Sequence, residues 1–425
     1  MVRAPCPTRP EVTDDPRARA GTPRARARLG IRSHGARRAP RAARHAHAPS
    51  AVIRVAFVQA SLGVGGAERL VQSLARRLNR SRIEPWILNL YGPGAIGEPM
   101  RAAGAPMVSH LASSALDPRT GGRLARALEE TRADVAYVYD SALPMFWMGC
   151  MRRRRTRPRL VLGFHSTGRL GDPVQHFLAR RAAVPVADRL VALAGSHRRF
   201  LARELRLPES RFDVLPSGVD LARFDAARPR DEARRAAGLP TGVPLVGIVA
   251  ALRPEKHHAL FLAAARRVLA SVPDARFVIA GDGPERAAIE RACRELALGE
   301  RVTLLGSRED VPVLYRALDV AVLSSHPVVE TLPVTLLEAA ACGTPAVATA
   351  VGSVADVVAE GETGFVVPAG DAAALADRIV RLLGDAALRE RMGTAARRRA
   401  EQHFDERDMV RRYEELFLST AGSPA

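Results

Sequence analysis

Lysine is almost absent from this strongly basic sequence of 425 residues. Lysine and arginine together number 64, and Lys256 is the only lysine, so 63 of these cations are arginine. A compositional bias toward arginine and alanine explains the shortage without any function. The stretch "LRPEKHH", from Leu252 to His258, therefore carries chemistry only if the motifs around it point to a binding site.

The sequence also lacks the signs of a secreted or membrane-spanning protein. Its four cysteines, Cys6, Cys150, Cys293 and Cys342, form no CxxC pair and no Cys/His cluster of zinc spacing, so we expect reduced, structural thiols. No apolar run approaches the ~20 residues that a membrane-spanning helix needs, and no signal-peptide core is present. We expect a cytoplasmic protein, and the length favours two domains.

Positive charge is concentrated at the N-terminus. Residues 1–50 contain twelve arginines and three acidic residues, a net charge of +9, which leaves +10 of the total of +19 for the remainder. This segment is rich in Arg, Ala and Pro and lacks hydrophobic periodicity, so it is predicted to be disordered. It is either a tail that binds anionic surfaces or an upstream extension from a misplaced start site. We expect no nucleic acid partner.

Regular structure is predicted from residue 52. Val52 to Val58 is an apolar, β-branched run of buried-strand length, and apolar residues then recur at helical spacing from Ala67 to Leu78. The glycine-rich stretch "SLGVGGAE" between them contains Gly65 and Gly66. Strand, glycine turn and helix is the beginning of a Rossmann-like unit, in which a helix N-terminus favours an anion, although such turns also serve only as connections.

The alternation of strands and helices continues in two series. Strands are predicted within "PWILNLYG", "DVAYVYD", "RLVLGFH" and "DRLVALAGS", and from Val243 within "VPLVGIVAALRPEK", "DARFVIAG", "ERVTLLG", "DVAVLSS" and "TPAVATA". Strands separated by helices indicate parallel sheets. We expect an α/β protein with two Rossmann-like, doubly wound domains facing each other across a cleft, at 51–215 and 216–400. Residues 401–425 form a helix and tail that pack back toward the first domain.

The second series contains two motifs that suit a ligand. "GDGPER" places Gly281 at a strand end and Pro284 at the first position of a helix whose backbone N–H groups are free. "ETLPVTLLEAAACGTPAVAT" sets Glu330 and Glu338 eight residues apart. If a helix begins near Pro333, Glu330 lies in the preceding loop and Glu338 in the second turn. A buried carboxylate needs a partner, and ribose hydroxyls would satisfy it.

These residues carry a resemblance to a known family. The E-x7-E stretch resembles the signature of glycosyltransferase family 4, the group 1 type retaining enzymes with the GT-B fold, which use sugar nucleotides. "GVGGAERLV", "GFHSTG", "LPSGVDLARF", "ALRPEKHH", "GDGPERAAIE", "LGSREDVPVLYRALDVAVLSS" and "GETGFVVPAGD" are similar to family blocks in the expected order. The resemblance spans about residues 52–418. It implies transfer of a sugar from a nucleoside diphosphate to an acceptor hydroxyl.

The resemblance implies roles for individual residues. Lys256 contacts the donor diphosphate, Glu330 the transferred sugar or its leaving phosphate, and Glu338 the ribose. His165 lies against the donor sugar. The other residues expected at the donor are Gly65, Gly66, Arg253, Gly281, Thr331, Leu332 and Val334, with Glu68 and Ser166 as weaker candidates. Many members have an arginine five residues before the lysine, where this sequence has Ala251, and we expect Arg253 to supply that charge.

The same resemblance implies how the reaction runs. No obvious carboxylate nucleophile lies near "GFHSTG", so the family's front-face route, with retention, is expected rather than a double displacement. No DxD motif lies in the predicted domains, which indicates metal-independent binding of the diphosphate by Lys256, Arg253 and helix ends. We expect no cofactor, because the sugar nucleotide is a substrate. The acceptor is unknown, and a lipid-linked acceptor in glycan, polysaccharide or glycolipid biosynthesis is one class to test.

Alternative interpretations stay open. A GT-B sugar-nucleotide epimerase would need no acceptor, and a non-catalytic protein would use the basic tail to bind an anionic ligand. A second open question concerns residues 143–159, "LPMFWMGCMRRRRTRPR", which join an apolar stretch to six arginines. This segment is either a buried helix followed by a solvated turn, or a peripheral contact with anionic lipid at the inner face of the membrane.

Overall fold

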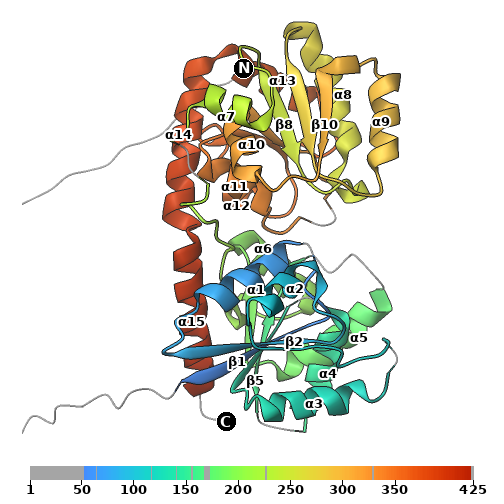
Figure 1. Ribbon diagram of the computed structural model, residues 1–425, viewed down its shortest axis with the longest axis vertical. Coiled ribbons are helices and arrows are strands. Elements are labelled where there is room, and N and C mark those ends of the chain that lie inside the picture. The colour runs from blue at the N-terminus through green and yellow to red at the C-terminus, as the bar shows by residue number, and fades with distance from the viewer. Residues whose placement is uncertain are drawn as a thin grey trace, which may run out of the picture. The chain divides into compact units, whose positions relative to one another are not determined.

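The computed structural model describes residues 52–63, 65–115, 117–139, 141–154, 157–166, 173–224, 227–327 and 330–422. The predicted disorder of residues 1–50 lies outside this part of the chain. The described strands form two parallel sheets, each with helices packed against it (Figure 1). The strand order is β3-β2-β1-β4-β5-β6-β7 in the first sheet and β10-β9-β8-β11-β12-β13 in the second. The expected pair of Rossmann-like domains is therefore confirmed.

The strands have the following bounds. The first sheet consists of β1 (Ile53–Gln59), β2 (Ile83–Asn89), β3 (Met107–Val108), β4 (Val135–Tyr139), β5 (Arg159–Gly163), β6 (Arg189–Ala192) and β7 (Phe212–Val214). The second sheet consists of β8 (Leu245–Val249), β9 (Arg276–Ala280), β10 (Val302–Gly306), β11 (Val320–Leu323), β12 (Ala346–Thr349) and β13 (Gly364–Val367). Every strand named from the sequence is present.

The helices follow the strands in alternation. Those between the strands of the first sheet are α1 (Gly66–Arg77), α2 (Gly94–Ala102), α3 (Thr120–Glu130), α4 (Ala142–Arg152), α5 (Pro173–Ala183) and α6 (Gly195–Leu205). The remainder are α7 (Arg230–Ala237), α8 (His258–Ser271), α9 (Arg286–Glu295), α10 (Val311–Ala317), α11 (Val334–Ala341), α12 (Val354–Val357), α13 (Ala372–Gly384), α14 (Ala386–His403) and α15 (Glu406–Gly422). Short 3₁₀ helices include η3 (Pro254–Lys256).

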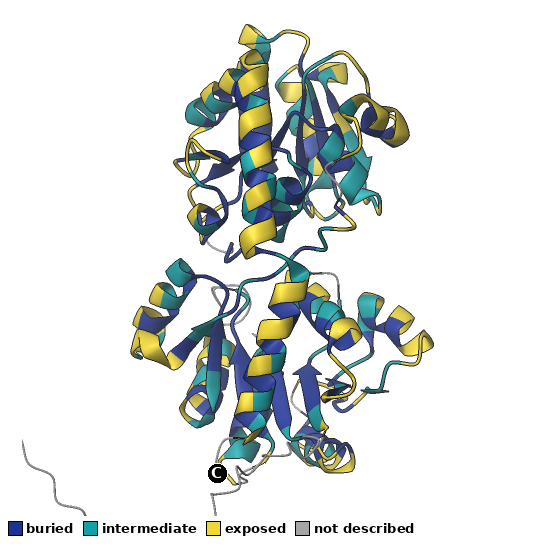
Figure 2. Cartoon of the chain, turned by 90° about the vertical axis from the view of Figure 1, so that its left-hand side faces the viewer, coloured by how far each residue is buried: buried dark blue, intermediate teal, exposed yellow. Residues whose placement is uncertain are grey.

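Both sheets are buried on their two faces, which explains why their strands read as continuous apolar runs. All five residues of β4 and of β5 are buried. Figure 2 shows the exposed residues concentrated on the outer surfaces of the helices. In each sheet the strand order reverses once, between β1 and β4 and between β8 and β11. Ligands of doubly wound folds bind outside the carboxyl ends of the strands at such a switch point.

The chain passes between the two sheets twice, and the two passages lie side by side. The first joins β7 to α7 and the second joins α14 to α15. Val219 and Asp405 form a parallel bridge, and the Val219 N–H donates to the carbonyl of Phe404 at 2.8 Å. Helix α15 then packs against α1, β1 and β4 (Figure 1). The expected domain boundaries after residues 215 and 400 stay predictions.

Helix α4 bears on the open question about residues 143–159. Its Met145 and Met148 are buried in the core of the first domain, and Gly149 allows a close approach of α5, because a β-carbon there would collide with the backbone of Ala182. Arg152, the last residue of α4, and Arg159, the first residue of β5, both pair with Asp188. The structure agrees with the buried-helix interpretation. Among the described helices, none is both long enough and apolar enough to cross a membrane.

One predicted helix start is wrong. Pro284 does not begin α9, which starts at Arg286, because Pro284 and Glu285 form a turn in which the Glu285 N–H donates to the carbonyl of Leu252 at 2.9 Å. Gly281 and Gly283 have positive φ angles of 144° and 155°. Side chains at these two positions would collide with the loop after β8, so the glycines let the two loops pack together.

Candidate active site

The loop after β8 carries Lys256 to the switch point of the second sheet. Lys256 ends η3, and its carbonyl accepts a hydrogen bond from the Ser324 hydroxyl at 3.0 Å. The His326 N–H donates to the carbonyl of Glu255 at 2.9 Å. The rings of His257 and His326 stack with their centres 3.8 Å apart. These contacts fix the position of Lys256 relative to the end of β11.

Lys256 forms an ion pair with Glu330. The Lys256 Nζ contacts Oε1 of Glu330, which also accepts a hydrogen bond from the Ser325 hydroxyl at 2.7 Å. The Glu330 residue is only 7% exposed. A buried carboxylate of this kind is stable only when it is paired and hydrogen-bonded. The structure thus brings together two residues that are 74 positions apart and that the resemblance placed at one site.

The N-terminus of α11 lies beside this pair and offers unused hydrogen-bond donors. Within the described residues, the backbone N–H groups of Thr331, Leu332 and Val334 have no acceptor. Pro333, the N-cap residue, contributes no N–H group. A helix start with free N–H groups is suited to an anion. The first turn of α1 lies opposite, since a β-carbon on Gly66 would be 3.6 Å from the Val334 side chain.

His165 follows β5 and reaches the same region. The Thr331 hydroxyl donates to the carbonyl of His165 at 2.8 Å, which links the histidine to the residue next to Glu330. The Nε2 atom of the imidazole lies 2.7 Å from the Tyr137 hydroxyl. Burial, with a smaller contribution from nearby His197, lowers the pKa of His165 to about 3. The imidazole is therefore neutral at physiological pH.

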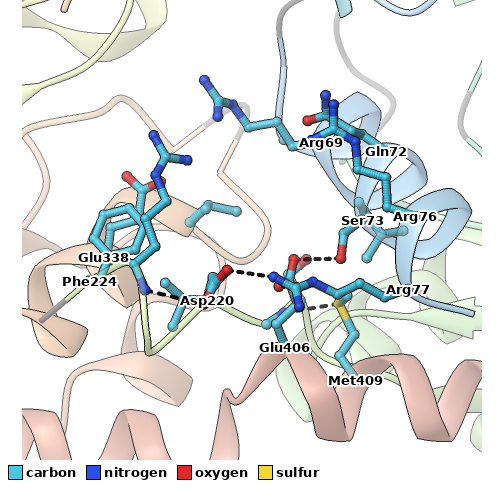
Figure 3. A pocket seen from close by; sticks show the side chains of 17 residues that line it. Arg69, Gln72, Ser73, Arg76, Arg77, Asp220, Phe224, Glu338, Glu406 and Met409 are labelled. Atoms are coloured by element: carbon cyan, nitrogen blue, oxygen red, sulfur yellow. Dashed lines mark hydrogen bonds and ion pairs between the residues drawn. The ribbon is translucent and has the colours of Figure 1, made fainter. Parts of the chain in front are cut away.

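Glu338 lies one helical turn beyond Val334, in a pocket of about 230 Å³ (Figure 3). Arg69 from α1 and Arg223 from the β7–α7 connection line the same pocket. Burial raises the pKa of Glu338 to about 7, although both arginines act to lower it. The carboxyl group has no hydrogen-bond partner among the described residues. It is thus available to a ligand.

The pocket has a surplus of positive charge. Arg77 pairs with two acids, Asp220 at 2.5 Å and Glu406 at 2.6 Å, so these three residues together carry one negative charge (Figure 3). The other cations at the pocket are Arg69, Arg76 and Arg223, and the remaining acid is Glu338. Four arginines against three acids, one of which is Glu338 with a pKa of about 7, leave a net positive charge, which favours an anionic ligand that also carries hydroxyl groups.

The other residues expected at the site lie as follows. Gly65 caps α1 in an extended conformation, and Gly66 begins the helix. The Gly281 N–H donates to the carbonyl of Gly306 at 2.8 Å, so it is not a free donor. Arg253 is exposed and has no side-chain partner in the described part of the chain. Among the described residues, no group of three or more His, Cys, Asp and Glu is placed to hold a metal ion.

Sequence reasoning missed several residues of the site. Arg69 and Arg223 were not named, although Arg69 lies three positions after Gly66 and thus on the same face of α1. Ser325 was not named either, because a serine after a strand has many structural roles. Tyr137, the partner of His165, lies in a buried strand where a tyrosine is usually read as core. None of these positions carries a local signal beyond its residue type.

Comparison with known proteins decides the family. The model of the group 1 glycosyl transferases matches residues 229–399, and that of glycosyltransferase family 4 matches residues 64–223. The chain is 31% identical over 365 residues to 2-deoxystreptamine N-acetyl-D-glucosaminyltransferase of Streptomyces fradiae, covering 76% of this chain and 82% of that protein. The chain belongs to the group 1 glycosyltransferases. The epimerase and the non-catalytic alternatives find no support among these relatives.

Two further comparisons describe the glycosyltransferase. It is 31% identical over 298 residues to D-inositol 3-phosphate glycosyltransferase of Nocardia farcinica, which covers 64% of this chain and 65% of that protein. Its fold is similar to that of HepE from Anabaena, solved in complex with UDP-glucose. The TM-score is 0.75 at 20% identity, over 86% of this chain and 100% of HepE. The GT-B fold expected from the sequence is thus confirmed.

Proposed function

We propose that this glycosyltransferase moves a sugar, with retention and without a metal ion, from a nucleoside diphosphate sugar to an acceptor hydroxyl. One observation carries the proposal: Lys256 and the free N–H groups of Thr331, Leu332 and Val334 converge at one switch point. An ammonium group and oriented amides are suited to a diphosphate, whose negative charge grows as it leaves.

Each part of the donor has a matching part of the site. The diphosphate lies between the N-termini of α11 and α1, near Gly65 and Gly66, with Arg253 and Gly281 at its edge. The ribose hydroxyls donate to Glu338, whose carboxyl is otherwise without a hydrogen bond. Arg69 and Arg223 add the positive charge that metal ions supply elsewhere. The complexes of HepE with UDP and with UDP-glucose support a nucleotide-sugar donor.

The reaction needs position and charge more than an acid/base pair. The acceptor hydroxyl attacks the anomeric carbon from the face that the diphosphate leaves. The bond from that carbon to the phosphate oxygen breaks, and the hydroxyl proton passes to the leaving phosphate oxygen. Glu330 lies where the sugar or the leaving phosphate is expected, and its ion pair with Lys256 orders both groups before the donor binds.

The acceptor class is best approached through the relatives. One is named for 2-deoxystreptamine, one for D-inositol 3-phosphate and one, from Bacillus anthracis, for L-malate. These are small, polar acceptors with free hydroxyl groups, and we propose that the acceptor of this enzyme belongs to that class or is lipid-linked. A panel should therefore contain cyclitols, cyclitol phosphates, hydroxy acids and a lipid-linked sugar.

A two-stage experiment tests the function. A panel of sugar nucleotides is first compared by thermal shift, since a ligand that binds only the folded state raises the melting temperature. The best binder is then incubated with the acceptor panel, with and without EDTA, and the anomeric configuration of the product is read by NMR. An inverted product, or activity lost in EDTA, would contradict the retaining or the metal-independent part. Absence of any stabilising nucleotide would contradict the whole proposal.

Two carboxylate variants locate the site. Glu338→Ala should weaken donor binding in isothermal titration, because it removes the ribose contact. Glu330→Ala should mainly reduce turnover, because its partner Lys256 acts on the leaving group. If both variants bind the donor and turn over like the wild type, the site is not where we place it. Glu290→Ala, at a half-exposed acid on α9, is the matched control.

A further inference from the structure

His165 belongs to a chain of hydrogen-bonded side chains that the reaction as described does not use. Its Nε2 atom lies 2.7 Å from the hydroxyl of Tyr137 on β4, and that hydroxyl lies 3.4 Å from the hydroxyl of Tyr413 on α15. Both tyrosines are fully buried. Burial raises the pKa of Tyr413, so its hydroxyl keeps its proton. The chain thus runs from the core of the first domain to the imidazole.

The backbone is shaped to allow this contact. Gly163 is the last residue of β5, and a β-carbon there would collide with the Tyr137 hydroxyl and come within 3.0 Å of His165 Nε2. Only glycine leaves room for the hydrogen bond. The rings of Tyr137 and Tyr139 both meet the imidazole edge-on, with ring centres 6.4 and 5.9 Å away. The ring of His165 is therefore held in one orientation.

The chemistry of the two groups favours one donor. The hydroxyl of Tyr137 lies within hydrogen-bond distance of Nε2, and a phenol O–H is a stronger donor than the N–H of a neutral imidazole, whose bare nitrogen is a good acceptor. If Tyr137 donates to Nε2, the single proton of the neutral imidazole must be on Nδ1. Within the described part of the chain, Nδ1 has no hydrogen-bond partner. An Nδ1–H group is then left for a ligand.

We propose that Tyr137 is a positioning residue that fixes His165 in the tautomer with its proton on Nδ1, so that the imidazole donates a hydrogen bond to an oxygen of the donor sugar. Tyr413 supports the arrangement by donating to the Tyr137 oxygen. The part that concerns the sugar rests on the proposed function. The tautomer itself is a property of the protein without any substrate.

The tautomer can be read directly. The full-length protein is labelled with ¹⁵N-histidine, and long-range ¹H–¹⁵N spectra distinguish Nδ1–H from Nε2–H. The His165→Gln variant assigns the signals among the eleven histidines. We expect the wild type to show one Nδ1–H tautomer for His165. Tyr137→Phe keeps the ring and its packing and should lose that preference. A wild-type proton on Nε2, or an unchanged tautomer in Tyr137→Phe, would overturn the proposal.

Tyr139→Phe is the matched control for the spectrum. It removes a hydroxyl from the other tyrosine against the same imidazole, but that hydroxyl bonds to Glu68 rather than to His165. The His165 tautomer should stay unchanged. Tyr413→Phe should have a smaller effect than Tyr137→Phe, because its contact of 3.4 Å is long for a hydroxyl donor.

Kinetics test the link to the reaction. Tyr137→Phe should lower kcat about tenfold, the effect of one well-placed hydrogen bond, while the KM for the donor changes little. A lost tautomer preference with unchanged kcat would overturn the role in transfer. A wild type that transfers no sugar would contradict the proposed function instead, and the spectrum would still decide the tautomer.

Discussion

At the scale of single residues, composition suggests that Lys256 is incidental, whereas the structure suggests that it has a role. The chain uses arginine for every other cation, yet the lysine is paired with the buried Glu330 beside free N–H groups. Lys256→Ala should lower turnover by about 10²–10³, because one oriented electrostatic contact in the transition state is lost. Lys256→Arg should recover only part, since a planar guanidinium does not reproduce a compact ammonium. Steady-state kinetics on both variants measures this.

The control for this prediction removes a cation that lies outside the site. Arg267→Ala removes an exposed cation from α8 and should leave turnover unchanged. Melting temperatures check the fold, and Lys256→Ala is expected to melt somewhat lower, because Glu330 loses its counter-ion while only 7% exposed. Full activity in Lys256→Arg would mean that the lysine is a remnant of compositional drift.

Glu338 predicts a proton release on donor binding. Its pKa is about 7, so near neutral pH part of the population is protonated. Ribose hydroxyls that donate to the carboxylate favour its charged form, and a proton should leave as the nucleotide binds. Titration calorimetry in buffers of different ionisation enthalpy detects this proton. The Glu338→Gln variant should show less release, and equal release in both proteins would contradict the assignment.

At the scale of elements, the sequence predicted most of the strands and missed three. β3 and β7 contain only two and three residues, too few for periodicity to mark them. β13 has four residues, as many as the predicted β6, β11 and β12, so its length does not explain why it was missed. The start of α11 after Pro333 was predicted correctly, because proline and the apolar run mark it. The start of α9 was wrong, because a proline that fits a first helical turn also fits the tight turn before it.

Part of the candidate site was predictable, because three of its residues follow predicted strands. Lys256, Glu330 and His165 lie in loops after strands, and parallel sheets gather residues from distant parts of the sequence at the carboxyl ends of their strands. Arg69, Arg223 and Tyr137 were not predictable, since their contribution depends on the direction of a side chain within a helix, a connection or a buried strand. The motifs thus identify the family and the loops, whereas the side chains between them require coordinates.

The loop that contains Glu330 packs against the loop after β12, which contains Gly352. Gly352 has a φ of 53°, and a β-carbon there would collide with the carbonyl oxygen of Glu330. Gly352→Ala should destabilise the protein by about 1–3 kcal/mol and reduce activity, because both the backbone conformation and the loop contact are lost. Denaturant unfolding and kinetics measure the two effects. Gly370→Ala, with a φ of 82° but open space around it, should lower stability without the loss of activity.

At the scale of the whole molecule, buried histidines predict sensitivity to acid. Burial lowers the pKa of His165 to about 3, and of His197 and His258 to about 4. Between pH 4 and 6.5 the unfolded chain binds protons that the folded chain excludes, so stability falls as the pH falls through this window. Glu338 changes stability in the opposite direction, because its raised pKa lets the folded chain keep a proton that the unfolded chain releases. It offsets the effect of about one of the three histidines.

His258→Leu tests the sign of this effect. The ring is 3% exposed, and neither of its nitrogens has a partner in the described structure. Without the imidazole, the free energy of unfolding should fall less steeply with acid, by up to about 1.4 kcal/mol per pH unit between about pH 4 and 6.5. Urea unfolding at pH 5 and pH 7 gives the comparison. A variant that loses as much stability as the wild type would contradict the prediction.

The placement of α15 has a consequence for synthesis. The helix is formed by residues 406–422, yet it covers β1 and β4 and buries Tyr413 and Phe417 against the first sheet. Domains generally fold in the order in which the ribosome makes them. Here the first sheet emerges early but stays uncovered on that side until the entire second domain has been translated. We therefore expect nascent chains stopped before residue 406 to expose an apolar face that chaperones bind and proteases cleave.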